Sequence, residues 1–160
     1  MMTWRFLTLL GAAAAAGCGG GGGDQPAPPP AAAEQASGGL TPFQLEHGIG
    51  PITEVLTLAD VDPKLAEQGK GVFEVKCTAC HKIGERYVGP ALDSVLIRRS
   101  PTFVMNMILN PNEMVERHPV AQKLLGEYMT LMANQSLTTE EARAVLEYLR
   151  TQTKTGPTGQ

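Results

Sequence analysis

Residues 77–81 of this chain read Cys-Thr-Ala-Cys-His, a spacing that suits covalent attachment of a haem. Two cysteines separated by two residues can each add to one vinyl group of a porphyrin, which gives two thioether bonds. The histidine that follows is then held under the iron, where its imidazole can be the proximal ligand. Cys77, Cys80 and His81 are therefore the first candidate binding residues, with one haem c as the cofactor and His81 as a metal ligand.

Other interpretations of this motif find less support in the rest of the chain. A Cys-x-x-Cys pair can be a redox dithiol, but that role is typical of a thioredoxin-like βαβ context, and no strand pattern precedes Cys77. The pair can also be half of a zinc site, but structural zinc takes four ligands, and His118 alone would have to complete the set. A chance occurrence is the remaining alternative. The flanking sequence favours haem attachment.

The third cysteine, Cys18, follows a short apolar segment that is typical of an export signal. Residues 6–16 are too few to span a bilayer, but they suit the apolar part of a signal peptide and follow the positive charge of Arg5. The box Ala15-Ala16-Gly17-Cys18 resembles the cleavage site of a bacterial lipoprotein, although Leu is preferred where Ala15 stands. We therefore expect a signal peptide over residues 1–17 and a lipidated Cys18. The alternative is an ordinary cleaved leader and a free thiol.

Residues 18–39 contain five consecutive glycines and a Pro-rich run, so they have almost nothing to bury and predict a disordered tether. We expect three parts after the tether: an extension arm over residues 40–61, a folded domain over 62–151 and a disordered tail over 152–160.

Export fits haem attachment, which in bacteria takes place outside the cytoplasm. The predicted location is the periplasm or the outer face of the cell membrane, with a lipid anchor. The net charge of −3 argues against binding of nucleic acid.

The folded part carries several helix signals and no convincing strand pattern, so we predict an all-α fold. Asp62-Pro63 is a typical helix start, with Asp as the N-cap and Pro at the first helical position. Thr138-Thr139-Glu140-Glu141 is a capping box, in which Glu141 reaches back to the cap residue. The predicted helices cover residues 63–76, 101–109, 119–128 and a segment from 139 onward, with a brief helical turn within 41–48. The stretch between the motif and Arg99 is predicted to be a loop.

Together these features resemble the class I, mitochondrial-type, monohaem cytochrome c family over roughly residues 62–150. The matching residues are Gly69, Phe73, the motif at 77–81, Gly89-Pro90-Ala91-Leu92, Val145 and Tyr148. The resemblance implies an N-terminal helix packed on a C-terminal helix beside the covalently bound haem, with Gly69 allowing the backbones to approach. It also implies that the Pro90 carbonyl accepts a hydrogen bond from His81 and so orients the ring.

In this family the second iron ligand is a methionine on the loop before the last helix. Met129 and Met132 are the two candidates in that loop. The resemblance favours Met132, which lies five residues ahead of the helix start at Leu137-Thr138. The chain departs from the family pattern at Ala133, where a proline often follows the ligand.

Several further residues are candidates for a role near the haem. Arg86, Arg98 and Arg99 are the nearest cations to the motif, and any of them could pair with a haem propionate or simply form a solvated loop. Tyr87 is a weaker candidate of the same kind. The remaining methionines and histidines are interpreted as structural: Met105, Met107 and Met114 as core residues, His118 as a surface turn residue, and His47 as remote from the haem.

The resemblance implies an electron carrier and not an enzyme, working between a membrane donor and a terminal reductase or oxidase. Residues 85–90, 132–135 and 46–51 are similar to a narrower group, the small cytochromes encoded beside nitrous oxide reductase in some bacteria. That group implies nitrous oxide reductase as the electron acceptor. One alternative is a fixed electron-transfer subunit of a respiratory complex, with residues 40–61 as a docking arm. Another is a haem enzyme or gas sensor, which needs an open distal site.

Overall fold

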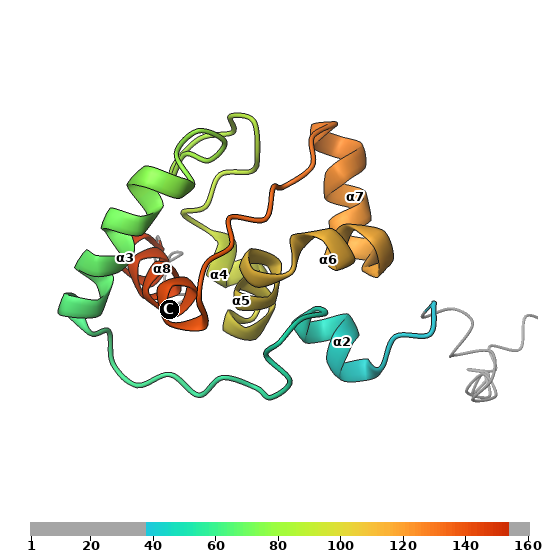
Figure 1. Cartoon of the computed structure of the whole chain (residues 1–160), viewed down its shortest axis with the longest axis horizontal. Coiled ribbons are helices and arrows are strands. Elements are labelled where there is room, and N and C mark those ends of the chain that lie inside the picture. Colours follow the sequence, from blue (N-terminus) through green and yellow to red (C-terminus); the bar gives the residue numbers. More distant parts are fainter. Residues whose placement is uncertain (1–37, 154–160) are drawn as a thin grey trace, which may run out of the picture.

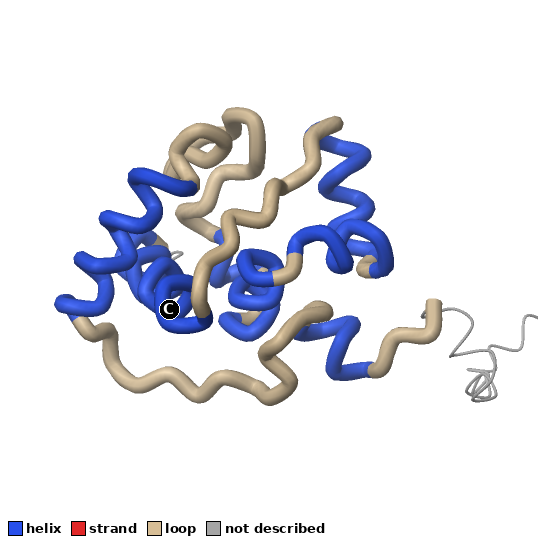
Figure 2. Tube along the Cα trace, viewed as in Figure 1, coloured by secondary structure: helices blue, strands red, loops and turns tan. Residues whose placement is uncertain are grey.

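A computed structural model describes residues 38–153 of the chain, which form seven helices and no strand (Figure 2). The helices, labelled in Figure 1, are α2 (Pro42–His47), α3 (Pro63–Lys76), α4 (Val95–Arg98), α5 (Pro101–Leu109), α6 (Pro111–Arg117), α7 (Pro119–Tyr128) and α8 (Thr139–Gln152). The predicted all-α class is confirmed. The predicted signal peptide and the lipidated Cys18 lie outside the described residues, as do most of the tether and of the tail. Among the helices described, none is long and apolar enough to cross a membrane.

The first and last long helices, α3 and α8, cross each other closely at one side of the molecule (Figure 1). Asp62 caps α3 by accepting hydrogen bonds from the amides of the next helical turn, and Thr138 and Glu141 form the predicted capping box of α8. At the crossing, a Cβ added to Gly69 would lie 1.8 Å from the carbonyl oxygen of Ala144. Only glycine, which has no Cβ, permits this approach.

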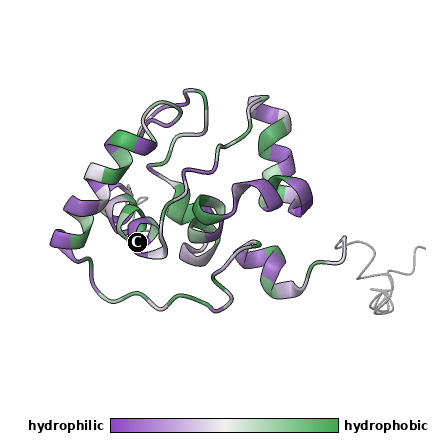
Figure 3. Ribbon diagram, viewed as in Figure 1, coloured by the Kyte–Doolittle hydropathy of each residue, from purple (hydrophilic) through white to green (hydrophobic). Residues whose placement is uncertain are grey.

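The main core lies between α3, α5 and α8. Phe73, Met105 and Leu146 are almost wholly buried in it, and the Phe73 ring packs against Tyr148 with centroids 5.3 Å apart. Figure 3 shows that α5, in the middle of the molecule, is apolar over most of its length. A helix that is apolar on all sides has to be covered on all sides. In this chain α8 covers one side of α5, and the arm before α3 covers another.

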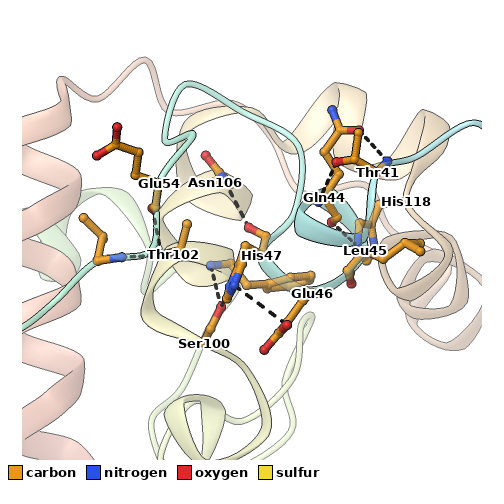
Figure 4. A network of polar contacts seen from close by, with 12 residues as sticks. Thr41, Gln44, Leu45, Glu46, His47, Glu54, Ser100, Thr102, Asn106 and His118 are labelled. Carbon is orange, nitrogen blue, oxygen red and sulfur yellow. Dashed lines mark hydrogen bonds and ion pairs between the residues drawn. The ribbon is translucent and has the colours of Figure 1, made fainter.

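Residues 40–61 form the arm that crosses α5, with α2 at its start (Figure 4). Asn106 of α5 is fully buried, and its side chain donates to the carbonyls of His47 and Ile52 and accepts from the amide of Ile52, at 2.9–3.0 Å. The ring of His47 shares a 2.8 Å hydrogen bond with Ser100 Oγ. The arm therefore satisfies the polar groups of α5 as well as covering its apolar ones. Further bonds join the backbone of Leu56 and Glu54 to Thr102 Oγ1.

A buried carboxylate joins the end of the arm to the last helix. Glu147 is fully buried on α8, where it receives hydrogen bonds from Arg143, from Arg150 and from the backbone amide of Asp62. Burial alone would raise the pKa of Glu147, but these three hydrogen bonds outweigh it and lower the pKa, so the group stays charged. Arg150 also donates to the carbonyl of Ala59 at 2.7 Å, which fixes the chain just before α3.

The prediction that His118 is a surface turn residue is wrong, because its side chain is fully buried. His118 caps α7: its Nδ1 accepts from the Val120 amide, and its Nε2–H donates to the carbonyls of Gln44 and Leu45 at 3.1 and 3.2 Å (Figure 4). Burial lowers the pKa of His118, which keeps the ring neutral. A neutral imidazole that uses both nitrogens leaves no polar group unsatisfied, so its burial is tolerated.

Two short helices differ from the sequence-based expectation. The stretch before Arg99 was expected to be a loop, which is wrong for the four residues of α4. The pair Asn110-Pro111 ends α5 as predicted, but Pro111 is also the first residue of α6. Proline lacks the amide that a helix interior needs, yet it suits the first helical position, so one residue can end one helix and begin the next.

Replacing Gly69 by Ala is expected to destabilise the fold by about 1–3 kcal/mol or more, because the new methyl group would overlap the α8 backbone. Gly71→Ala is the matched control on the same helix, since a Cβ at that position meets nothing within 4 Å. It should stabilise the protein by up to about 1 kcal/mol through helix propensity. Denaturant unfolding of both variants measures the difference. Equal stabilities would contradict the proposed role of the crossing.

Candidate functional site

The Cys-x-x-Cys-His motif begins where α3 ends. Cys77 is the C-cap of α3, and its carbonyl accepts from the amides of Cys80 and His81 at 3.1 and 2.9 Å. This tight turn brings the three side chains to one place. Both cysteines are free thiols, Cys77 partly buried and Cys80 exposed. Burial and the neighbouring Cys80 raise the pKa of Cys77 to about 11.

His81 is held by the loop that follows it. Its Nδ1–H donates to the carbonyl of Pro90 at 3.2 Å, as the resemblance implied. A second bond, from the Gly89 amide to the Cys80 carbonyl at 2.8 Å, closes the loop at the same point. With the proton on Nδ1, the lone pair is on Nε2, the arrangement that suits a metal ligand. Burial lowers the pKa of His81, and the Pro90 hydrogen bond partly offsets this, so the ring is neutral.

The approach of the loop to His81 requires glycine at position 89. A Cβ added to Gly89 would lie 2.5 Å from Cε1 and 2.9 Å from Nδ1 of the His81 ring. The sequence Gly89-Pro90 thus combines a close approach with a carbonyl acceptor, and both act on the same imidazole.

A cavity opens beside the motif, and its walls are mostly apolar. Cys77, Cys80, His81 and Pro90 line one part of it, and Met132 lines it from the segment before α8. Met129, the other candidate, does not line the cavity and is 83% exposed. The structure therefore brings Met132, and not Met129, to the same cavity as His81. Other apolar lining residues include Phe73, Leu92, Val104, Met107, Ile108, Leu124, Leu125 and Leu149.

Some parts of this wall were not predicted from the sequence. Met107 was assigned to the core together with Met105 and Met114; the latter two are buried, but Met107 lines the cavity. The sequence also gave no prediction that α7 would line the cavity, which it does through Leu124 and Leu125. Apolar spacing on α7 signals a buried face, but the sequence does not say whether that face meets protein or a cofactor.

The charged residues around the cavity are all basic. Among the lining residues that the structure describes, Lys76, Arg98 and Arg99 are cations and none is Asp or Glu. Arg98 donates to Ser94 and to the carbonyl of Ala91 at 3.1 Å. Of the side chains that could pair with a haem propionate, Arg98 and Arg99 line the cavity, whereas Arg86 and Tyr87 do not.

The donor groups fit a covalently held haem better than the alternatives. A planar apolar macrocycle needs an apolar cavity, two free thiols at one edge, and nitrogen or sulfur ligands on its faces. All of these are present in one place. Within residues 38–153, no three His, Cys, Asp or Glu side chains cluster in a way that could hold a metal ion, and His118 is used in capping α7. A zinc site at Cys77 and Cys80 would therefore lack its remaining ligands.

Comparison with known proteins gives one family and a set of related structures. The cytochrome c family model matches residues 66–153. A solved structure of cytochrome c from Rhodothermus marinus is 47% identical, with a TM-score of 0.65, and the match covers 70% of this chain and 97% of that chain. An engineered cytochrome c from the same organism is 46% identical with the same coverage and TM-score. The engineered protein bound to a carbene intermediate is 47% identical, with the same coverage and a TM-score of 0.63. A comparison with curated proteins gave no match.

The structural match extends beyond the family model. It covers 70% of a 160-residue chain, which is more than residues 66–153, and only a few residues follow position 153. The match therefore reaches into the arm before residue 66. At least part of the arm therefore lies within the structural match, whereas the family model begins after the arm.

Gly89→Ala is expected to push the His81 ring away from Pro90 and to cost about 1–3 kcal/mol of stability, because the added methyl overlaps the ring. Gly84→Ala is the control in the same loop, where the nearest atom would be 4.0 Å away. Denaturant unfolding gives the stability, and nuclear magnetic resonance of the His81 ring reports its position. An unshifted His81 ring in Gly89→Ala would refute this account of the loop.

Proposed function

Because this chain belongs to the cytochrome c family, we propose that Cys77 and Cys80 hold a haem through thioether bonds and that His81 and Met132 ligate its iron. The family carries covalently attached haem c, usually one in a small chain, and its all-α fold is that of the class I cytochromes c. The protein is an electron-transfer protein. When bound, the haem supplies reversible one-electron chemistry.

The observation that supports this proposal best is the pairing of His81 and Met132 on one apolar cavity. On one side, burial keeps the His81 ring neutral, and the Pro90 carbonyl holds the ring proton on Nδ1, which leaves the Nε2 lone pair for the iron. On the other side, a neutral thioether is a soft ligand that favours the reduced state and raises the reduction potential. Two protein ligands leave no open position for a substrate, which favours a carrier over a haem enzyme or gas sensor.

The basic residues of the cavity have a complementary role in this proposal. Haem carries two propionates, and an all-cationic set of charged residues around the cavity offsets their negative charge. Arg98 and Arg99 are the candidates that line the cavity. Arg86 is engaged elsewhere, in an ion pair with Glu127.

For the cell, we propose an exported carrier anchored through a lipidated Cys18 and moving electrons from a membrane donor to nitrous oxide reductase. The support is the sequence: an apolar leader, a lipoprotein-like box and a Gly/Pro-rich tether. A tether raises the effective concentration of the domain near membrane partners. The contacts of residues 40–61 with α5 are intramolecular, which favours a carrier over a fixed subunit that docks through this arm.

Met132→Ala should remove the weak near-infrared sulfur–iron band of the oxidised protein and lower its reduction potential. A shift on the order of 100 mV is expected, a fraction of the roughly 0.8 V range that axial ligands set. Met129→Ala is the matched control, since that side chain is 83% exposed and outside the cavity. Visible and near-infrared spectra with a redox titration measure both. Loss of the band in Met129→Ala and its retention in Met132→Ala would reverse the ligand assignment.

Cys18→Ser is expected to move the exported protein from the membrane to the soluble fraction, because the residue that carries the proposed lipid anchor is lost. The measurement is fractionation of cells, followed by stopped-flow oxidation of the reduced wild-type protein by nitrous oxide reductase. Release of the variant from the membrane supports the lipid anchor, and fast oxidation of the wild type supports nitrous oxide reductase as the acceptor. A variant that stays on the membrane would refute the anchor, and a wild type that the reductase does not oxidise would refute the acceptor.

A further inference from the structure

The segment that carries Met132 has few anchors of its own. Among the described residues, the hydrogen bonds made by 130–137 stay inside this segment: Gln135 Nε2 to the Ala133 carbonyl, and the Ser136 amide to Asn134 Oδ1. No backbone bond ties the segment to the rest of the described chain. The position of Met132 therefore depends on the apolar contacts of the cavity and on how firmly the two ends of the segment are held.

The two ends are held very differently. The C-terminal end runs into α8, whose capping box and buried face fix it. The N-terminal end leaves α7 through Met129, which adopts the left-handed conformation at φ 52°. The principal helix–helix contact of α7 is with α6, and Ala121 near its start is its one buried residue. The end of α7 thus has little packing to hold it, and it lies only a few residues from Met132.

One side chain from the other side of the cavity reaches this loosely packed helix end. Arg86, in the loop after His81, donates to Glu127 Oε1 at 3.1 Å and to the Glu127 carbonyl at 3.0 Å. Its guanidinium also stacks on the ring of Tyr128, 4.2 Å from the centroid, and Tyr128 lines the cavity. The carbonyls of a last helical turn lack partners within the helix, and a cation there is favoured by the helix dipole.

We propose that Arg86 is a positioning residue for the distal ligand: it fastens the end of α7 to the proximal loop and thereby keeps Met132 on the iron. This inference rests on the proposed function, because it takes Met132 as the ligand. Arg86 supplies three contacts to two adjacent residues, Glu127 and Tyr128. The contact joins the loop that orients His81 to the helix that leads into the Met132 segment, so the positions of both proposed iron ligands would depend on it.

The test compares Arg86→Gln with Arg117→Gln in the holoprotein. Arg117 is the matched control, because it is another partly exposed arginine in an ion pair, with Glu113 at 2.6 Å, and it does not line the cavity. Carbon monoxide should bind reduced Arg86→Gln about tenfold faster than the wild type, equivalent to about 1.4 kcal/mol of weakened ligation. The Met129 amide, which donates to the Leu125 carbonyl at the end of α7, should also exchange hydrogen faster. Arg117→Gln should match the wild type in both the carbon monoxide rate and the hydrogen exchange. Arg86→Lys should lie between the wild type and Arg86→Gln, since lysine keeps the positive charge but not the forked donor geometry of arginine.

Each result bears on the proposal. If Arg86→Gln behaves like Arg117→Gln in both measurements, Arg86 does not position the ligand, whereas the ligation by Met132 stands. If the wild-type protein lacks the near-infrared sulfur–iron band, the ligation itself fails and the role of Arg86 fails with it. Should Arg86→Gln not mature as a haem protein, Glu127→Lys gives the same test from the partner side. Faster carbon monoxide binding in Glu127→Lys supports the proposal, and an unchanged rate overturns it.

Discussion

The contact between the backbones of α3 and α8 at Gly69 fixes where the two sides of the haem cavity lie. The α3 helix runs directly into Cys77, and the segment that carries Met132 runs directly into α8. The distance between the two helices therefore sets the distance between the attachment motif and the distal segment. With the Ala144 carbonyl where the Cβ of any other residue would lie, the spacing is possible only with glycine.

The two sides of the cavity are stabilised by different means. The proximal side is local: His81 bonds to Pro90, nine residues later, and Gly89 bonds back to Cys80. Such short loops cost little entropy to close, so the histidine can be oriented before the rest of the fold is complete. The distal side is assembled from α5, α6, α7 and the Met132 segment, and its order depends on tertiary contacts and on the haem that fills the space between them.

This difference explains which features could be predicted from the sequence. The helix starts at Asp62-Pro63 and Thr138 follow from local chemistry, and the structure has both as predicted. The hydrogen bond from His81 to Pro90 was implied by the family resemblance, and the structure has it too. The burial of His118 could not be predicted, because its acceptors belong to α2, more than 70 residues earlier in the chain. The same holds for Arg86, whose partner is 41 residues away. Met132 was predicted by resemblance, since spacing alone left Met129 open.

The arm before α3 is part of what holds the cofactor cavity in place. Met107 and Ile108 of α5 line the cavity, so the distal wall depends on how α5 is held. The buried amide of Asn106 on the same helix has all its partners in the arm, and an unsatisfied buried group would cost about 1–3 kcal/mol. Leu40 and Ile49 of the arm pack in one cluster with Phe103 of α5. The arm and the helix therefore stabilise each other, and the match of the Rhodothermus marinus structures to this chain reaches into the same arm.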